Sequence, residues 1–309
     1  MAVYVNTNVS SLNGRRYLNN VQNQLTTTYQ RLSSGLRINS AKDDAAGLQI
    51  SSRLTTQING LNQGNRNASD GVAFAQTAEG AMDEITGMLQ KIRTLAVQAN
   101  NGTNTADDRK ALQKEATSLV EEITRIAKQT KFGGSLILDG AGANSIMTKG
   151  GGGGQAGQTK DHIGKLTLQV GANKGDTISF EVNAMKFSQI ASAAGVAAND
   201  LKKYYDAAKG MVFTNAAELG NIISHMDKLI GAVDASRAGL GAIQNRLESS
   251  IRNQANVSAN QADARSRIRD ADFAEESANL SQQSIIQQAA TSMLMQANTR
   301  PQLGLSLLG

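Results

Sequence analysis

The chain has 309 residues and a net charge of +5, with one proline, no cysteine, no tryptophan, six phenylalanines and five tyrosines. The lack of cysteine excludes disulfides, cysteine nucleophiles and cysteine-based metal sites, and so few aromatic residues fit poorly with the core of a large α/β enzyme. The basic residues do not gather with aromatic residues as they would in a nucleic-acid-binding protein, and no apolar run approaches the roughly 18–20 residues of a membrane span.

The first part of the chain predicts helices. Apolar residues from Leu18 to Leu32 recur at spacings of three and four, which is typical of one helix face. The sequence Ser33-Ser34-Gly35 predicts the end of this helix. Ser40 and Asp43 have the form of a capping box and predict the start of the next helix.

Two heptad seams follow, separated by the turn sequence Asn100-Asn101-Gly102. Thr105 and Asp108 predict the capped start of the second helix. Two seams joined by a short turn predict an antiparallel helical hairpin. The first seam comprises Ala78, Met82, Ile85, Leu89, Ile92 and Ala96, and the second comprises Leu112, Ala116, Leu119, Ile123 and Ile126.

The middle of the chain predicts a small β region. Ser135–Leu138 followed by Asp139-Gly140 indicates a strand and a turn, and Gly150–Gly154 indicates a loop. Alternating apolar residues in 166–170 and 178–182 predict two half-buried strands joined as a hairpin by GANKGD. Residues 184–213 carry no clear pattern.

Helical spacing returns after Thr214 and continues to the end. The predicted seam contains Leu219, Ile223, Met226, Ile230 and Val233. Pro301 predicts the end of the last helix. The fold class that we expect is therefore mainly α, a long antiparallel helical rod or coiled coil built from both termini, with a small β-hairpin region in the middle.

Residues 277–309 contain six glutamines and a single charge, Arg300. A solvated helix normally carries charges on its outer face. This segment therefore suits burial among copies of itself, and the alternative is a poorly ordered tail.

The sequence contains no motif for catalysis, a cofactor or a metal. His162 and His225 lie far apart and outside any HExxH motif, and the glycine run lacks the Gly-Lys-Ser/Thr of a phosphate-binding loop. Asp43-Asp44 and Glu121-Glu122 are adjacent along a helix and so do not face each other. We expect a protein that is not an enzyme.

The ends of the chain resemble bacterial flagellin, the subunit of the flagellar filament. The N-terminal matches are RLSSGLRINSAKDDAAGLQIS (31–51), NRNASDGVAFAQTAEGAMDEI (65–85) and LQKIRTLAVQANNGT (89–103). LTLQVGANKGDTISF (166–180) resembles the family's β hairpin. The C-terminal matches are LGAIQNRLESSI (240–251), ARSRIRDADFAEE (264–276) and QANTRPQLGLSLLG (296–309).

The resemblance implies three regions. Residues 1–42 with 272–309 form a terminal coiled-coil domain, the inner core. Residues 43–183 with 214–271 form a helical rod domain with β hairpins. Residues 184–213 are a short variable insert, so we expect no full outer domain.

The resemblance also implies a structural subunit that polymerises into the filament used for swimming, with terminal helices that fold on assembly. The implied partners are copies of the chain, flagellar cap and hook-junction proteins, and an export chaperone at the C-terminal segment. We expect type III export to the extracellular filament, with no nucleic acid and no membrane insertion. The implied polymerisation core comprises Leu18, Val21, Leu25, Leu32, Leu280, Ile286, Met293, Leu305 and Leu308.

Some flagellins are recognised by the animal Toll-like receptor 5. The matching positions are Gln90, Lys91, Leu95 and Glu115. The recognised forms carry arginine where this chain has Lys91, and lysine lacks the planar bidentate fork of arginine. Leu95 and Glu115 have an alternative role in subunit packing.

Three other protein classes are alternatives. A flagellar hook–filament junction protein shares the terminal helices, although the central QVGANKG and the short length favour the filament subunit. An enzyme-bearing flagellin needs a catalytic insert, which the short middle does not provide. A general coiled-coil scaffold leaves the end motifs unexplained.

Overall fold

The computed structural model describes residues 7–141, 144–149, 163–206, 210–213 and 216–306. The chain divides into two compact units. The terminal unit comprises Met1–Asn59 and Val257–Gly309, and the central unit comprises Gly60–Asn256. Long helices dominate, which confirms the predicted fold class.

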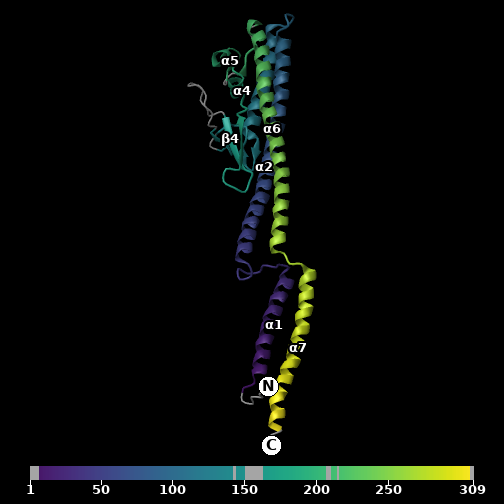
Figure 1. The fold of residues 1–309 in the computed structure, drawn as a ribbon. Coiled ribbons are helices and arrows are strands. Elements are labelled where there is room, and N and C mark those ends of the chain that lie inside the picture. The colour runs from purple at the N-terminus through teal and green to yellow at the C-terminus, as the bar shows by residue number, and fades with distance from the viewer. Residues whose placement is uncertain (1–6, 142–143, 150–162, 207–209, 214–215, 307–309) are drawn as a thin grey trace. The chain divides into compact units, whose positions relative to one another are not determined.

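In the terminal unit, helix α1 (Val9–Ser34) and helix α7 (Phe273–Ser306) lie side by side (Figure 1). Gly35 ends α1 with φ +71°, a left-handed conformation that suits glycine, as the sequence predicted. The segment that follows α1 pairs with the segment that precedes α7. The Arg37 N–H donates to the Arg269 carbonyl at 2.7 Å, and the Ala271 N–H donates to the Gly35 carbonyl at 3.0 Å.

The predicted capping box at Ser40 and Asp43 is wrong, because these residues form a turn before the helix. The Asp43 carboxylate accepts the Ser40 N–H at 2.8 Å, and this backbone hydrogen bond is the main reason that the pKa of Asp43 is lowered. Helix α2 (Ala45–Ala99) begins two residues later. There the Asp44 carboxylate caps it by accepting the Gly47 N–H at 2.9 Å.

The prediction that α7 ends at Pro301 is also wrong, because the helix continues to Ser306. Proline has no N–H, so the carbonyl four residues earlier, that of Ala297, loses its helical partner. The Asn8 side chain takes that place and donates from Nδ2 to the Ala297 carbonyl at 2.7 Å. A contact from 289 residues away thus compensates for the proline.

The central unit is built on α2, α3 (Ala106–Gln129) and α6 (Ala216–Arg269). Thr105 and Asp108 form the predicted capping box of α3, and hydrogen bonds from Thr105 lower the pKa of Asp108. All six predicted seam residues of α2 are fully buried. On α3 and α6 only part of the predicted seam is fully buried, because apolar residues beside the seam share the core. The half-buried seam residues are Leu112, Leu119, Ile126, Ile223 and Ile230, and the additional buried residues are Val120, Ala127, Ile222 and Leu229.

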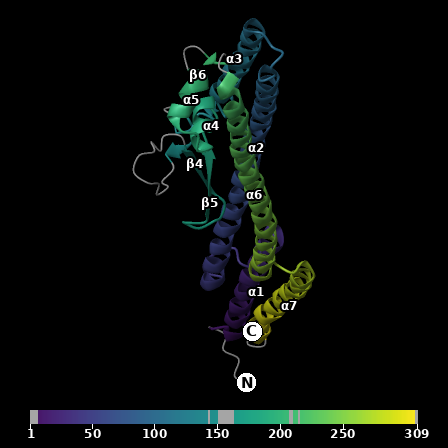
Figure 2. The same cartoon turned by 90° about the horizontal axis from the view of Figure 1, so that it is seen from above.

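A three-stranded antiparallel sheet packs on these helices (Figure 2). Strands β4 (Ile163–Gln169) and β5 (Thr177–Asn183) form the predicted hairpin, with Leu166 opposite Phe180. The sequence missed β3 (Thr148–Lys149), which pairs with β4. Two further strands, β1 (Lys131–Phe132) and β2 (Ser135–Leu136), pair near the end of α3. The predicted glycine loop at 150–154 lies outside the described residues.

Residues 184–213 contain short elements that join the same core. These are α4 (Phe187–Ala193), α5 (Ala198–Tyr204), β6 (Tyr205–Asp206) and β7 (Gly210–Met211). Tyr204 is buried against His225, with the two ring centroids 5.3 Å apart. Burial raises the pKa of Tyr204 and lowers that of His225. His225 is therefore a packed histidine, and His162 lies outside the described residues.

Candidate assembly surface

The α1–α7 pair contains few buried apolar side chains. Val21 and Leu25 on α1 are 4% and 7% exposed, and Ala290 on α7 is also buried. Among the described residues, neither of the two hydrophobic clusters includes a residue of the terminal unit. The described part of the terminal unit therefore buries much less apolar surface than the central unit does.

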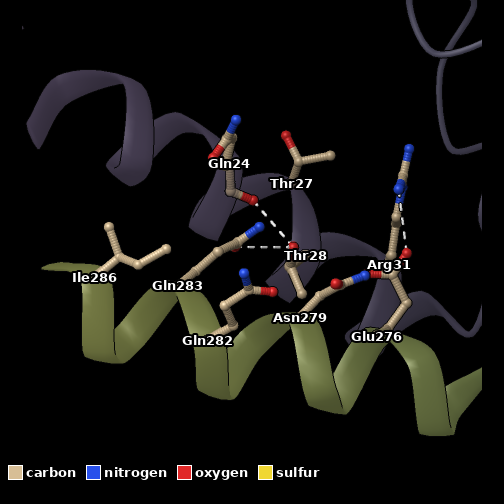
Figure 3. A pocket seen from close by; sticks show the side chains of 9 residues that line it. All are labelled: Gln24, Thr27, Thr28, Arg31, Glu276, Asn279, Gln282, Gln283 and Ile286. Atoms are coloured by element: carbon tan, nitrogen blue, oxygen red, sulfur yellow. Dashed lines mark hydrogen bonds and ion pairs between the residues drawn. The ribbon is translucent and has the colours of Figure 1, made fainter. Parts of the chain in front are cut away.

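Polar contacts also join α1 and α7. Thr28 is buried, and its hydroxyl donates to the Gln283 side-chain oxygen at 3.1 Å. Arg31 forms an ion pair with the buried Glu276 carboxylate at 3.1 Å. Figure 3 shows these groups facing each other across the two helices. Such contacts define which turns meet but contribute modestly to stability, about 0.5–1.5 kcal/mol for a typical hydrogen bond.

A polar groove of about 380 Å³ runs between the two helices. Its lining consists mainly of amide and hydroxyl side chains (Figure 3). Amides both donate and accept hydrogen bonds, so this groove matches the uncharged composition of residues 277–309. The lining residues are Gln24, Thr27, Thr28, Arg31, Glu276, Asn279, Gln282, Gln283 and Ile286.

Large apolar side chains are exposed on both helices. Ile285 is 66% exposed and Met293 is 70% exposed. Both lie in the part of α7 that follows residue 276, where Arg300 is the single charge. A helix that is apolar on several sides is normally buried within a larger assembly. We name these side chains the apolar surface of the terminal unit: Val9, Leu12, Tyr17 and Tyr29 on α1, and Phe273, Ile285, Met293 and Met295 on α7.

The structure separates the residues of the predicted polymerisation core. Val21 and Leu25 are buried within one chain, while Met293 is exposed. Leu18, Leu32, Leu280 and Ile286 are half-buried. Leu308 and the side chain of Leu305 lie outside the described residues. Leu12, Tyr17, Ile285 and Met295 do not belong to the predicted core, because they lie off its single apolar stripe. Their signal in the sequence is the presence of apolar residues on the remaining helix faces.

The four candidate receptor residues lie in the central unit. Lys91 on α2 and Glu115 on α3 form an exposed ion pair at 2.9 Å, and Gln90 is also exposed. Leu95 is 6% exposed because it belongs to the buried core of α2. Gln90, Lys91 and Glu115 are therefore accessible on a single chain, and Leu95 is not.

Within the described residues, no group of three or more histidine, aspartate and glutamate side chains is arranged to hold a metal ion. The described helices also include none with the length and hydropathy of a membrane span.

Paired terminal helices, a separate helical core and a large exposed apolar surface define a helical structural subunit that assembles with other chains. Two family models match the sequence, the bacterial flagellin N-terminal helical region at residues 5–143 and the bacterial flagellin C-terminal helical region at residues 223–308. Polar flagellin C of Vibrio parahaemolyticus is 37% identical, and flagellin A of Vibrio anguillarum is 38% identical; each alignment covers the whole of both chains.

The chain belongs to the bacterial flagellin family, and it is a structural subunit of the flagellar filament that bacteria use for swimming. A solved structure assigned as a flagellar hook-associated protein of Vibrio parahaemolyticus has a TM-score of 0.57 and 16% identity, and it covers 74% of this chain and 100% of its own. At that identity the likeness shows a shared fold alone, so it does not favour the hook-junction alternative.

Proposed function

We propose that this filament subunit assembles through α1 and α7, and that neighbouring copies bury the apolar surface of the terminal unit. The exposure of Ile285, Met293 and their apolar neighbours, in a segment (277–309) that holds a single charge, carries this proposal. Burying one such side chain contributes roughly 1.5–3 kcal/mol. A contact of this kind that repeats without closing on itself produces a helical filament.

The terminal helices fold when the subunit joins the filament. Ordering a backbone costs roughly 1–2 kcal/mol per residue, and the described α1–α7 contact buries few apolar side chains to offset that cost. Burial against other copies then supplies the missing stabilisation, which is coupled folding and binding.

The domain plan follows the three regions expected from the sequence. Residues 1–42 with 272–309 form the inner core, residues 43–183 with 214–271 form the rod, and residues 184–213 are an insert in place of an outer domain. The alignment with polar flagellin C supports the small insert, since it spans 384 positions against the 309 residues of this chain.

Deleting residues 277–309 tests the assembly proposal. We expect a soluble protein that keeps the cooperative unfolding of the central unit but forms no filaments, because most of the α7 assembly surface is lost. Electron microscopy after seeding with filament fragments is the measurement, and circular dichroism shows whether the central unit remains folded. Normal filaments from the truncated chain would overturn the proposal.

The filament lies outside the cell, and the subunit reaches it unfolded through the flagellar type III apparatus. Membership of the flagellin family and the absence of cysteine support this route. The same membership supports cap and hook-junction proteins as partners, and a chaperone for the C-terminal segment. The protein has no enzymatic role in this scheme.

Toll-like receptor 5 is a further partner in this proposal, with Gln90, Lys91 and Glu115 as contacts and Leu95 as packing support. The exposed Lys91–Glu115 ion pair favours it. Replacing Lys91 by arginine is expected to tighten receptor binding severalfold, because arginine adds a bidentate donor. Titration of the soluble receptor ectodomain measures this, with Lys228→Arg on the exposed surface of α6 as control. Absence of binding by both the parent chain and the Lys91→Arg variant rejects the partner.

A further inference from the structure

Three Asn-Gly pairs occur in the chain: Asn13-Gly14, Asn59-Gly60 and Asn101-Gly102. In such a pair the backbone nitrogen of glycine can attack the asparagine side chain, because glycine has no side chain to obstruct the approach. The sequence alone makes the three pairs equivalent candidates for this reaction. Their backbone environments differ.

Two of the pairs lie inside helices. Asn13-Gly14 belongs to α1 and Asn59-Gly60 belongs to α2. There the glycine N–H takes part in the helical hydrogen-bond ladder, and the helical ψ near −42° must change before a five-membered ring can close. Both glycines are also crowded, since a Cβ at Gly14 would lie 3.1 Å from Leu294 and one at Gly60 would lie 2.7 Å from Ala172.

Asn101-Gly102 lies in the connection between α2 and α3, outside both helices. Asn101 and Gly102 are exposed, and no heavy atom lies within 4 Å of the position where a Gly102 Cβ would stand. The backbone of Asn101 helps to hold the turn, because its N–H donates to the Gln98 carbonyl at 3.1 Å and its carbonyl accepts the Asn104 N–H at 3.2 Å. The Asn104 side chain also donates to the Gln98 carbonyl at 2.6 Å. The reacting atoms, Cγ of Asn101 and the backbone nitrogen of Gly102, take no part in these hydrogen bonds, and the space around Gly102 is open.

We propose that Asn101 is a spontaneous modification site that converts to aspartate and isoaspartate. The Gly102 nitrogen attacks Cγ of Asn101, a C–N bond forms, the nitrogen loses its proton, and the side-chain amide leaves as ammonia. Water then opens the resulting succinimide at either carbonyl. Attack at one carbonyl yields aspartate and attack at the other yields isoaspartate, with water as the sole co-reactant.

The product changes the turn in two ways. It adds one negative charge two residues after the end of α2, where the helix dipole disfavours an anion. Isoaspartate also adds a methylene to the backbone between residues 101 and 102, which strains the turn hydrogen bonds of Asn104 without interrupting either helix. A chain can thus accumulate this modification with age while its helices persist.

Peptide mass spectrometry of the full chain incubated in mildly alkaline buffer tests the proposal, with an isoaspartyl methyltransferase as the probe for isoaspartate. Asn59 in α2 is the matched control. Asn13 is not used, because it lies in α1, which we propose to become ordered only on assembly. In the folded chain Asn101 is expected to convert at least about tenfold faster than Asn59, since a helical site reacts only from a locally opened state. In urea the two rates should become similar.

Gly102→Ala is the mechanistic variant, because the open space at Gly102 accommodates a methyl group and the chain remains folded. It is expected to slow conversion at Asn101 severalfold. Equal rates at Asn101 and Asn59 in the folded chain would overturn the proposal, as would a Gly102→Ala chain that converts as fast as the parent.

Discussion

Replacing Gly64 by alanine is expected to destabilise the central unit by about 1–3 kcal/mol, because it displaces the β4–β5 hairpin from α2. An alanine Cβ at Gly64 would lie 2.7 Å from the backbone carbonyl carbon of Val170 and still closer to its oxygen. A backbone group cannot rotate away as a flexible side chain can. Gly60 and Gly71 on the same helix are similarly close to the hairpin, so the hairpin must move to admit the methyl group.

Gly80→Ala and Gly87→Ala are the matched controls for this substitution. Both glycines lie on exposed positions of α2, and no atom lies within 4 Å of either added Cβ. Alanine there should stabilise the helix by up to about 1 kcal/mol. Urea unfolding of the full chain measures all three variants. If the Gly64→Ala chain proves as stable as the Gly80→Ala chain, the close packing of the hairpin against α2 is wrong.

Replacing Asn8 by serine is expected to destabilise filaments, and the loss should shrink when Pro301 is also replaced by alanine. Serine retains the capping oxygen that accepts the Ser11 N–H, but its side chain is too short to reach the Ala297 carbonyl. The Pro301→Ala substitution restores a backbone N–H that can donate to that carbonyl. The expected loss from Asn8→Ser alone is about 0.5–1.5 kcal/mol per subunit, the net value of a typical hydrogen bond.

The thermal dissociation of filaments of the parent chain, both single variants and the double variant provides a double-mutant cycle. A smaller loss from Asn8→Ser in the Pro301→Ala background supports the view that the Asn8 side chain donates in place of the N–H that proline lacks. An equal loss from Asn8→Ser in both backgrounds would contradict the idea that the Asn8 side chain compensates for the N–H that Pro301 lacks.

Local rules predicted the elements whose partners are close in sequence. The Thr105–Asp108 box, the Gly35 helix end and the β4–β5 hairpin all depend on residues a few positions apart. Pro301 could not be predicted in this way, because its compensation comes from Asn8 at the other end of the chain. The Asp43 turn was missed because Asp43 and Asp44 both suit a cap, and it is Asp44 that accepts an N–H of the first helical turn.

The predicted polymerisation core overlaps the apolar surface of the terminal unit only at Met293, which is exposed. Val21 and Leu25 followed from one apolar stripe and are buried within the single chain. Ile285 and Met295 are exposed on other faces of a helix that has no single stripe, so periodicity did not select them. Low charge was the better signal in 277–309, since it applies to all faces of the helix at once.

Oxidation of Met293 and Met295 tests the central claim most directly. Exposed methionines oxidise readily to the sulfoxide, and burial protects them. Mass spectrometry after brief peroxide treatment compares the free subunit, the assembled filament and the filament dissociated by heating. We expect rapid oxidation of both residues in the free and dissociated subunits and strong protection in the filament. Equal oxidation in the subunit and the filament would contradict burial of the apolar surface between copies.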